Sequence, residues 1–309
     1  MSIERVGTNA HTQIIFAQLR QASSALVDSE RQVATGKVAS DYSGFGARSG
    51  ALEAARSAAK RADAHKAVAD RALGRLDLQD LNITRLGDMA AELRQAMTET
   101  LASNDGEAFM TLVRNVFDRA AETLNARDPS GFIFAGERDD TAAMKVSSLD
   151  ALAALPAVGD AFANGSIKRA VRVGDGETIE IGALASDLGT ELMSLLRDIA
   201  LFDQGNAFGG NLSAAQVSFL ESKLPEAISV AEHLNVAAAA NGLKYQQVKA
   251  ASERQSAASV VFKGFVSDIE DVDIGEALSR LNQNQVMLQA ALHVTSTLNR
   301  LSLLDFLAP

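Results

Sequence analysis

The C-terminal stretch IGEALSRLNQNQVMLQAALHVTSTLNRLSLLDFL, residues 274–307, contains no proline and places apolar side chains at steps typical of one helix face. One seam comprises Ile274, Leu278, Leu281, Leu288, Leu292 and Thr295, with Ala277, Ala291, Leu298 and Leu301 beside it. A stripe of this width is more than a single partner helix covers. The stretch therefore predicts a long helix that packs against several neighbours.

The longest helical pattern lies earlier, in residues 51–101. Its apolar positions recur at steps of three, four and seven: Ala55, Ala59, Ala62, Ala69, Leu73, Leu76, Ile83, Leu86, Ala90, Leu93 and Met97. This heptad spacing is typical of a coiled coil or helical bundle. A shorter seam near the N-terminus comprises Ile15, Leu19, Ala22, Leu26 and Val33. It predicts another helix, which ends at the polar, glycine-containing residues 35–46.

Proline and glycine mark the ends of the remaining helices. Helices are predicted at residues 107–125, at 186–202 and from residue 213 almost to the end of the chain. Pro225 is expected at a first turn or at a break, and Asn241-Gly242 at a kink.

The centre of the chain has a different character. IKRAVRV and TIEI flank the turn sequence GDGE at residues 174–177, so Val171 and Val173 are expected to pair with Ile179 and Ile181 in a hairpin. The chain is therefore expected to be mainly α. It would form a long antiparallel helical bundle or coiled coil from its N- and C-terminal arms, with a small mixed, mostly β central module.

This expectation divides the chain into five segments. They are an N-terminal helix segment (1–45) that pairs with 270–309, the N-terminal half of a helical rod (46–136), the β-containing module (137–185), the C-terminal half of the rod (186–269) and a C-terminal helix (270–309).

Composition excludes several classes of partner. The formal net charge of −10 disfavours binding to nucleic acid and to anionic membranes, both of which reward clustered Lys and Arg. The absence of cysteine excludes disulfides and thiol chemistry. No stretch is long and apolar enough to span a membrane. Charged and polar residues interrupt the first twenty positions, where a secretory signal would need an unbroken apolar run.

Motifs for catalysis, cofactors and metals are missing. GFGARSG at residues 44–50 lacks the full glycine spacing of a dinucleotide loop and follows a polar loop. The acidic residues between 268 and 276 do not have EF-hand spacing, so they indicate an exposed face or a helix N-terminus. None of the four histidines, His11, His65, His233 and His293, has a second ligand three or four residues away. The sequence therefore predicts no catalytic residue, no cofactor and no metal site, and the chain is not expected to be an enzyme.

Both ends of the chain resemble one protein superfamily. DIEDVDIGEALSRLNQNQVMLQAALHVTSTLNRLSLLDFL, residues 268–307, is similar to the C-terminal helix shared by bacterial flagellins and hook-associated junction proteins, including its SLLDFL ending. QVATGKVASDYSGFG, residues 32–46, resembles the loop that follows the first helix in that superfamily. The two similar segments stand at opposite ends of the chain and in the family's order.

The stretch LNARDPSGFIFAGERDD, residues 124–140, separates two branches of this superfamily. Flagellins usually carry an Asn-Phe-Asn-Gly type segment here, whereas hook-filament junction proteins (hook-associated protein 3) carry a Gly-aromatic-hydrophobic-Phe-Ala-Gly type. Residues 131–136, GFIFAG, follow the second pattern. Phe132 stands where Tyr is common, and ERDD lacks a Thr-rich continuation, so a filament flagellin stays open as the alternative.

The resemblance implies a structural subunit of the bacterial flagellum that joins hook to filament. It implies extracellular assembly after type III export without a cleaved signal peptide. The implied partners are identical subunits in a ring, another hook-associated protein, flagellin, and an export chaperone that holds the C-terminal helix. From other classes, a secreted coiled-coil effector and an enzyme with its site in the central module stay open.

Assembly is expected to use the terminal helices, with residues 270–309 as the polymerisation helix. The expected interface residues are Ile3, Val6, Ile14, Ile15, Leu19, Leu281, Leu288, Leu292, Leu298, Leu301, Leu303, Leu304, Phe306 and Leu307. A lone terminal hairpin would be marginal, because roughly 1.5 to 3 kcal/mol per buried large side chain opposes about 1 to 2 kcal/mol per ordered residue. Both ends are therefore expected to be frayed in the free chain and ordered in the assembly.

Overall fold

The computed structural model describes the backbone of residues 3–307 and the side chains of residues 13–297. These residues form two compact units, a terminal unit (residues 1–61 with 258–309) and a central unit (residues 62–257). The elements in chain order are α1 (Ile3–Thr35), the 3-10 helix η1 (Tyr42–Arg48), α2 (Ser49–Ser103), α3 (Phe109–Leu124), β1 (Arg127–Asp128), β2 (Gly131–Phe132), α4 (Leu149–Ala154), the 3-10 helix η2 (Val158–Ala161), β3 (Ala170–Gly174), β4 (Glu177–Glu180), α5 (Ala185–Gly205), α6 (Ala214–Glu270) and α7 (Ile274–Leu307). The predicted mainly α fold with small antiparallel strand pairs near the centre is confirmed.

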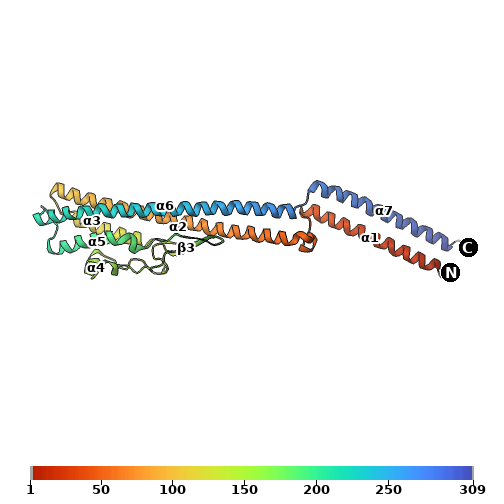
Figure 1. Ribbon diagram of the computed structural model, residues 1–309, viewed down its shortest axis with the longest axis horizontal. Helices are drawn as coiled ribbons and strands as arrows, with labels where there is room; N and C mark the ends of the chain where they lie inside the picture. Colours follow the sequence, from red (N-terminus) through yellow and green to blue (C-terminus); the bar gives the residue numbers. More distant parts are fainter. Residues whose placement is uncertain (1–2, 308–309) are drawn as a thin grey trace. The chain divides into compact units, whose positions relative to one another are not determined.

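In the terminal unit, α1 and α7 lie side by side and run in opposite directions (Figure 1). Their facing positions, half-buried or buried, follow alternating steps of four and three. On α1 they are Ile15, Leu19, Ala22, Leu26, Ser29 and Val33, and on α7 they are Ala277, Leu281, Asn284, Leu288, Ala291 and Thr295. This heptad spacing is that of a coiled-coil seam. The predicted pairing of the two chain ends is therefore the organising contact of this unit.

The seam on α7 differs from the predicted one. Ile274, Leu278 and Leu292, which the sequence pattern placed on one seam with Leu281 and Leu288, are exposed. Ala277 and Ala291, expected beside the seam, lie in it instead. The reason is the width of the apolar stripe: faces about 100° apart are both apolar, so hydrophobicity alone does not identify the one that faces α1.

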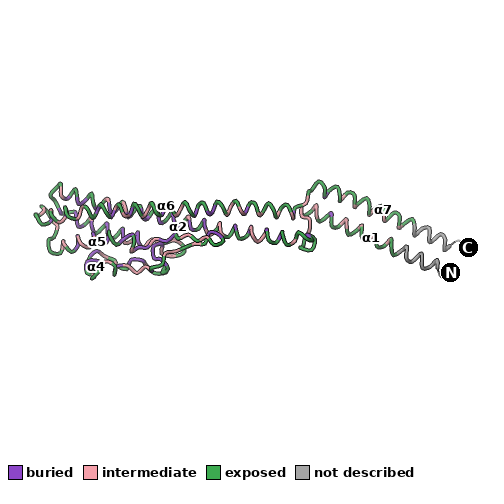
Figure 2. Tube along the Cα trace, viewed as in Figure 1, coloured by how far each residue is buried: buried purple, intermediate pink, exposed green. Residues whose placement is uncertain are grey.

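In the central unit, α2 and α6 are antiparallel, and α3 and α5 complete a helical core (Figures 1 and 2). The predicted α2 heptad is confirmed, because every member is buried except the half-buried Leu73. Phe109, Phe202, Phe208 and Phe219 form a chain of ring contacts among α3, α5, α6 and the loop after α5. Phe202 and Phe219 stack with centroids 4.0 Å apart. These contacts close one end of the core.

The β3–β4 hairpin has one irregularity. Val171 pairs with Ile179 as predicted, but a shift of register between Arg172 and Gly174 leaves Val173 outside the ladder. The predicted pairing of the two valines with the two isoleucines is therefore only partly correct, because Val173 and Ile181 lie outside the ladder. The Ile181 amide donates to the Arg169 carbonyl instead, at 2.8 Å. The bulge turns both side chains inward, where they pack with Leu76 of α2 and Val248 of α6. The hairpin is thereby fastened to the long helices.

Pro225 lies inside α6, twelve residues into a continuous helix, so neither the first-turn position nor the break is correct. A proline leaves the carbonyl four residues earlier without its helical hydrogen bond. Pro225 and Glu221 are both exposed. Water can therefore satisfy that carbonyl, and the helix continues.

A buried arginine of α2, Arg75, binds residues 128–133, at the start of the GFIFAG segment. The Arg75 guanidinium forms an ion pair with Asp128 and donates to Ser130 Oγ at 3.0 Å. It also donates to the carbonyls of Phe132 and Ile133, at 3.1 and 3.2 Å. Burial, as the largest effect, lowers the pKa of Arg75. Since its side chain is only 6% exposed, these acceptors replace the water around its two terminal nitrogens, whereas the buried Nε has no hydrogen-bond partner.

Two glycines of GFIFAG stand where a side chain would not fit. Gly131 has φ of 132°, and a Cβ there would lie 2.3 Å from the Asp139 carbonyl oxygen. Gly136 has φ of 67°, and a Cβ would lie 2.8 Å from the Ile167 carbonyl oxygen. Between them Ile133, Phe134 and Ala135 are buried in the core. The motif is thus an apolar wedge held by two tight backbone contacts.

We expect Arg75→Met to destabilise the central unit by roughly 3 to 5 kcal/mol, because Asp128 would stay buried without its partner. Chemical denaturation followed by circular dichroism measures this. Arg85→Met, at an exposed position of the same helix, should change stability by no more than about 0.5 kcal/mol. Equal effects of the two substitutions would contradict the role given to Arg75.

Alanine substitutions of two glycines test whether crowding around Gly136 is important for stability. Gly176, in the β3–β4 turn, also has positive φ, 81°, but open space around its Cα. We expect Gly176→Ala to cost about 1 to 2 kcal/mol from the backbone conformation alone. Gly136→Ala should cost clearly more, since it adds a clash with backbone. Thermal unfolding of both variants makes the comparison, and a Gly136→Ala loss no larger than that of Gly176→Ala would refute the crowding argument.

Candidate assembly surface

Most large apolar side chains that the described part of the chain leaves exposed belong to the terminal unit. On α1 and α7 they are Ile14, Phe16, Val27, Ile274, Leu278, Val286, Met287, Leu292 and Val294, and on the last turns of α6 they are Val260, Val261 and Phe265. Several are about half exposed or more; Val286, for example, is 65% exposed. Such a concentration is typical of contact surfaces, so the terminal unit carries the candidate assembly surface.

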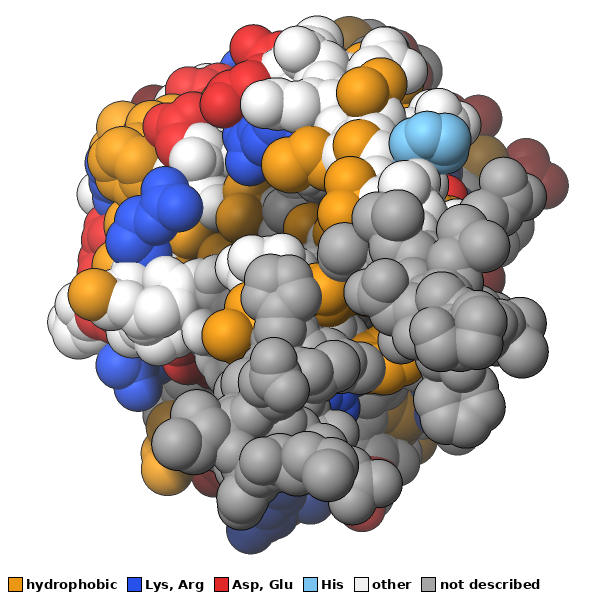
Figure 3. Space-filling view, turned by 90° about the vertical axis from the view of Figure 1, so that its right-hand side faces the viewer, with side chains coloured by type: hydrophobic (Ala, Val, Ile, Leu, Met, Phe, Trp, Pro, Cys, Tyr) orange, Lys and Arg blue, Asp and Glu red, His pale blue; other side chains and the backbone are white. Residues whose placement is uncertain are grey.

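On α1 and α7, most of these residues flank the seam on one side or the other. On α7, Ile274, Leu278 and Leu292 lie on one flank, whereas Met287 and Val294, seven residues apart, lie on the other. Figure 3, which looks onto one end of the molecule, shows hydrophobic side chains beside polar and charged ones. Each helix of the pair therefore has more apolar surface than the other one covers.

The seam by itself gives little stability. A heptad of α7 places two residues in the seam, and at most one of them is large and apolar, as with Ala277 and Leu281. Full burial of that side chain would stabilise the pair by roughly 1.5 to 3 kcal/mol per heptad. The apolar side chains on the exposed flanks could therefore stabilise this helix pair further if another molecule covered them.

The structure separates the predicted interface residues into three groups. Ile15, Leu19, Leu281 and Leu288 lie half-buried in the seam within the chain. Ile14 and Leu292 lie on exposed flanks. The other predicted residues, Ile3, Val6, Leu298, Leu301, Leu303, Leu304, Phe306 and Leu307, lie outside the described side chains.

Sequence reasoning missed other exposed apolar residues, including Phe16, Val27, Val286, Met287 and Val294. Their signal was present in the sequence, because they are large apolar residues outside the heptad positions of both helices. Apolar residues outside the seam of a two-helix pair are available to further partners.

A polar clamp joins the loop after α1 to the break between α6 and α7. The Val38 amide donates to the Glu270 carbonyl at 2.7 Å, and the Val272 amide donates to the Gly36 carbonyl at 2.9 Å. Lys37 Nζ lies 2.6 Å from Asp271 Oδ1 and 3.1 Å from Glu270 Oε2. Arg56 forms a second ion pair with the buried Glu270. The clamp thus fixes the point from which both terminal helices extend.

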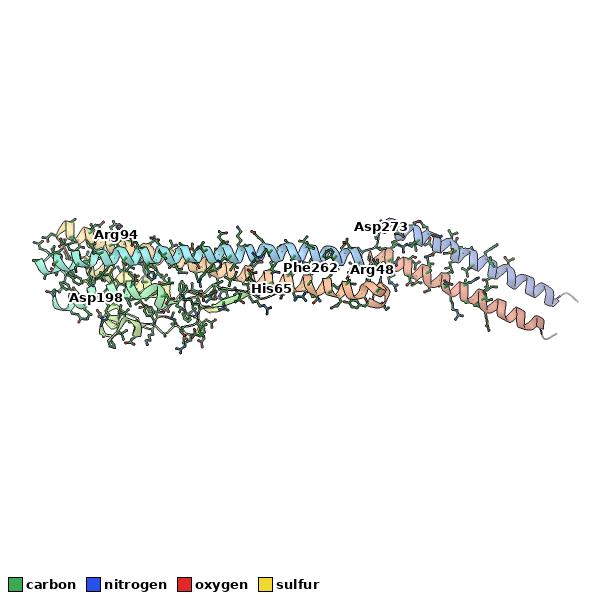
Figure 4. All side chains as sticks on the ribbon, viewed as in Figure 1. Arg48, His65, Arg94, Asp198, Phe262 and Asp273 are labelled. Atoms are coloured by element: carbon green, nitrogen blue, oxygen red, sulfur yellow. The ribbon has the colours of Figure 1, made fainter. Side chains whose placement is uncertain are left out.

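Asp273 immediately precedes α7, two residues after Asp271 of this clamp (Figure 4). Its Oδ1 accepts hydrogen bonds from the amides of Gly275 and Glu276, at 2.8 and 3.2 Å. These amides have no partner within the helix, so Asp273 is an N-cap. This agrees with the expectation of helix N-terminal charge for the acidic residues there.

Within the described residues there is no group of histidine and acidic side chains that could hold a metal ion. No described helix is long and apolar enough to cross a bilayer. The features that stand out are therefore surfaces and polar fastenings.

The clamp gives a pH dependence. The hydrogen bond from Lys37 lowers the pKa of Asp271 below its ordinary 3.8, and Asp271, followed by Glu270, raises the pKa of Lys37 above 10.5. A carboxyl group whose pKa is lower in the folded state stabilises the fold at pH values above its unfolded-state pKa. This stabilisation is lost as the pH falls through the folded-state pKa. A lysine whose pKa is higher in the folded state stabilises the fold at pH values below its unfolded-state pKa. That stabilisation is lost as the pH rises through the folded-state pKa.

We therefore expect the clamp to weaken on acidification below about pH 4 and to persist at neutral pH. Asp271→Asn should weaken it already at neutral pH and remove this acid dependence. Hydrogen exchange at the Val38 and Val272 amides, compared between variants at the same pH, measures the effect. Asp268→Asn, an exposed neighbour, is the control, and an equal response of both variants would speak against the clamp.

Comparison with known proteins gives a consistent result. Residues 228–307 match the family model for the bacterial flagellin C-terminal helical region. No curated protein sequence is significantly similar to the chain. The predicted flagellin-type C-terminal region is confirmed by the first match.

Solved structures are similar over most of the chain. One is a protein of Vibrio parahaemolyticus described as a flagellar hook-associated protein, with 15% identity and a TM-score of 0.57, covering 71% of this chain and 96% of that one. Another is FlgL of Bacillus cereus, with 12% identity and a TM-score of 0.53, covering 70% of this chain and 98% of that one. The chain therefore combines a flagellin-type C-terminal helical region with the fold of flagellar hook-associated proteins.

Proposed function

We propose that this chain is a structural subunit of the bacterial flagellum that joins the hook to the filament. The observation that carries the proposal is the terminal helix pair: its C-terminal helix lies within the match to the flagellin C-terminal region, and both of its helices expose apolar flanks. A helix pair with uncovered apolar flanks suits an assembly in which neighbouring subunits supply the cover.

The same surface supports a set of partners. Identical subunits would cover part of the flanks within a ring, while another hook-associated protein and flagellin would continue the contacts on either side. Before assembly, an export chaperone would cover the C-terminal helix, because exposed apolar helix faces associate non-specifically. Export through the flagellar type III channel, without a cleaved signal peptide, would deliver the chain to the cell exterior.

One observation supports a structural role for the buried charge near the GFIFAG segment: Arg75 donates to the carbonyls of Phe132 and Ile133 and so holds that segment. The five segments expected from the sequence remain part of this proposal, with residues 270–309 as the polymerisation helix and residues 137–185 as a module outside the terminal contacts.

Electron microscopy of cells that lack this chain tests the function. We expect hooks without filaments, together with filament protein released into the medium. Normal filaments in such cells would refute the proposal. A filament flagellin, the alternative role, would instead grow long filaments from the purified protein alone, whereas a junction subunit would bind hook ends and stop.

A surface variant tests the interface. Leu278 and Leu292 lie on one exposed flank of α7, 43% and 51% exposed. Leu278→Asp with Leu292→Asp should leave the helix content of the free chain unchanged. It should weaken binding to isolated hooks at least tenfold, since each leucine removed from a contact costs roughly 1.5 to 3 kcal/mol. Hook pelleting with labelled protein measures the binding.

The matched control is Val236→Asp with Leu243→Asp, two exposed apolar positions on the central-unit part of α6, 66% and 68% exposed. These substitutions add the same charge to an exposed helix outside the terminal unit and should leave hook binding intact. Equal loss in both double variants would argue against the α7 flank as the interface.

A further inference from the structure

Among the described side chains, the seam between α1 and α7 contains one polar layer that is hydrogen-bonded from helix to helix. Asn284 Nδ2 donates to the Ala25 carbonyl at 3.1 Å and to Ser29 Oγ at 2.7 Å. Ser29 Oγ in turn donates to the Ala25 carbonyl at 2.9 Å. Ser29 is only 5% exposed. Asn284 thus reaches across the seam to two oxygens of α1, one of them on a buried side chain.

The other polar residue of the α7 seam behaves differently. Thr295 Oγ1 donates to the Ala291 carbonyl of its own helix, at 2.7 Å. This bond would survive any rotation or sliding of α7 against α1. Among the described side chains of α7, Asn284 is therefore the seam residue whose hydrogen bonds depend on how the two helices face each other.

Apolar burial alone would not select the observed seam face. Two of the four apolar positions on that face are alanines, Ala277 and Ala291. The adjacent flank carries Ile274, Leu278 and Leu292, which are larger and exposed. If burial decided, α7 would turn this flank toward α1, because larger side chains gain more on leaving water.

The polar layer opposes that rotation. Turning the Leu278–Leu292 flank toward α1 would carry Asn284 away from Ser29 and the Ala25 carbonyl and break both hydrogen bonds across the seam. A polar residue in an otherwise apolar helix interface is known to fix the pairing geometry at some cost in stability. The backbone clamp between Gly36–Val38 and Glu270–Val272 holds the helix origins, and the seam side chains further along α7 add to what fixes its rotation.

We propose that Asn284, with Ser29, selects the face by which α7 pairs with α1, and so keeps the Ile274–Leu278–Leu292 flank free for neighbouring subunits. The first part concerns the single chain. The second rests on the proposed function, because it assigns the freed flank to assembly. Specificity here comes from a polar contact that penalises the competing apolar arrangement.

Disulfide trapping tests the proposal, and the chain has no cysteine of its own. Ala22→Cys is combined either with Ala291→Cys, which reports the observed seam, or with Leu292→Cys, which reports the flank. Positions 291 and 292 differ by one residue, so they stand at almost the same height but about 100° apart. Oxidation rates are measured in dilute, monomeric protein.

We expect the 22–291 disulfide to form at least tenfold faster than the 22–292 disulfide in the parent chain. Asn284→Leu should reduce this ratio about tenfold, and Ser29→Ala should reduce it as well, although Asn284 is retained. Gln283→Leu, the same kind of polar-to-apolar change at an exposed position on the side of α7 away from the Ile274–Leu278–Leu292 flank, should leave the ratio unchanged. Circular dichroism confirms helix content in each variant.

The proposal is overturned if the parent shows no preference between the two disulfides, or if neither Asn284→Leu nor Ser29→Ala changes the ratio. Failure of the proposed function would look different, since hook binding would be absent while the disulfide ratio still responded to Asn284. Loss of hook binding in Asn284→Leu, with a changed disulfide ratio, would connect the selected face to assembly.

Discussion

The contact on which the terminal unit depends is the pairing of the two chain ends, α1 with α7, through a narrow heptad seam. The seam uses small residues such as Ala22, Ala277 and Ala291, so the two backbones can approach closely, but little apolar area is buried per turn. The consequence is a helix pair that is defined in geometry and weak in energy. Its larger side chains, Leu278 and Leu292 among them, remain outside as material for other contacts.

The central unit is also built from long helices, but it buries larger side chains than the terminal unit does. Its helices bury leucine, isoleucine, methionine and phenylalanine, so the core does not depend on a partner. The GFIFAG segment is held there by Arg75 and by glycines at 131 and 136, whose backbone contacts exclude a Cβ. A motif that separates two branches of a superfamily by resemblance is thus, in this chain, a packing device.

Much of this architecture could be predicted from the sequence, because long heptads such as the one ending at Met97 leave few alternatives to a helix. The face of α7 could not be predicted, since Ile274 and Leu278 satisfy the same periodicity as Leu281. The choice depends on Asn284 meeting Ser29, two residues far apart in the chain, and a one-dimensional pattern contains no such contact. The bulge at Val173 was missed for a related reason, because register depends on what the hairpin packs against. On the candidate surface, the pattern included the exposed Ile14 and Leu292 but did not separate flank residues from seam residues.

A weak seam beside a wide apolar flank is consistent with the export and assembly proposed for this chain. A subunit that passes through a narrow export channel benefits from terminal helices that separate at low cost, since a stable hairpin would have to be opened first. The same subunit needs a single mode of pairing once it arrives. A polar layer reconciles the two requirements, because hydrogen bonds between Asn284 and α1 add little net stability in water-accessible surroundings yet are lost in every competing arrangement. Stability can then come from the neighbours that cover the flank, so the helix pair becomes firm only where the assembly needs it.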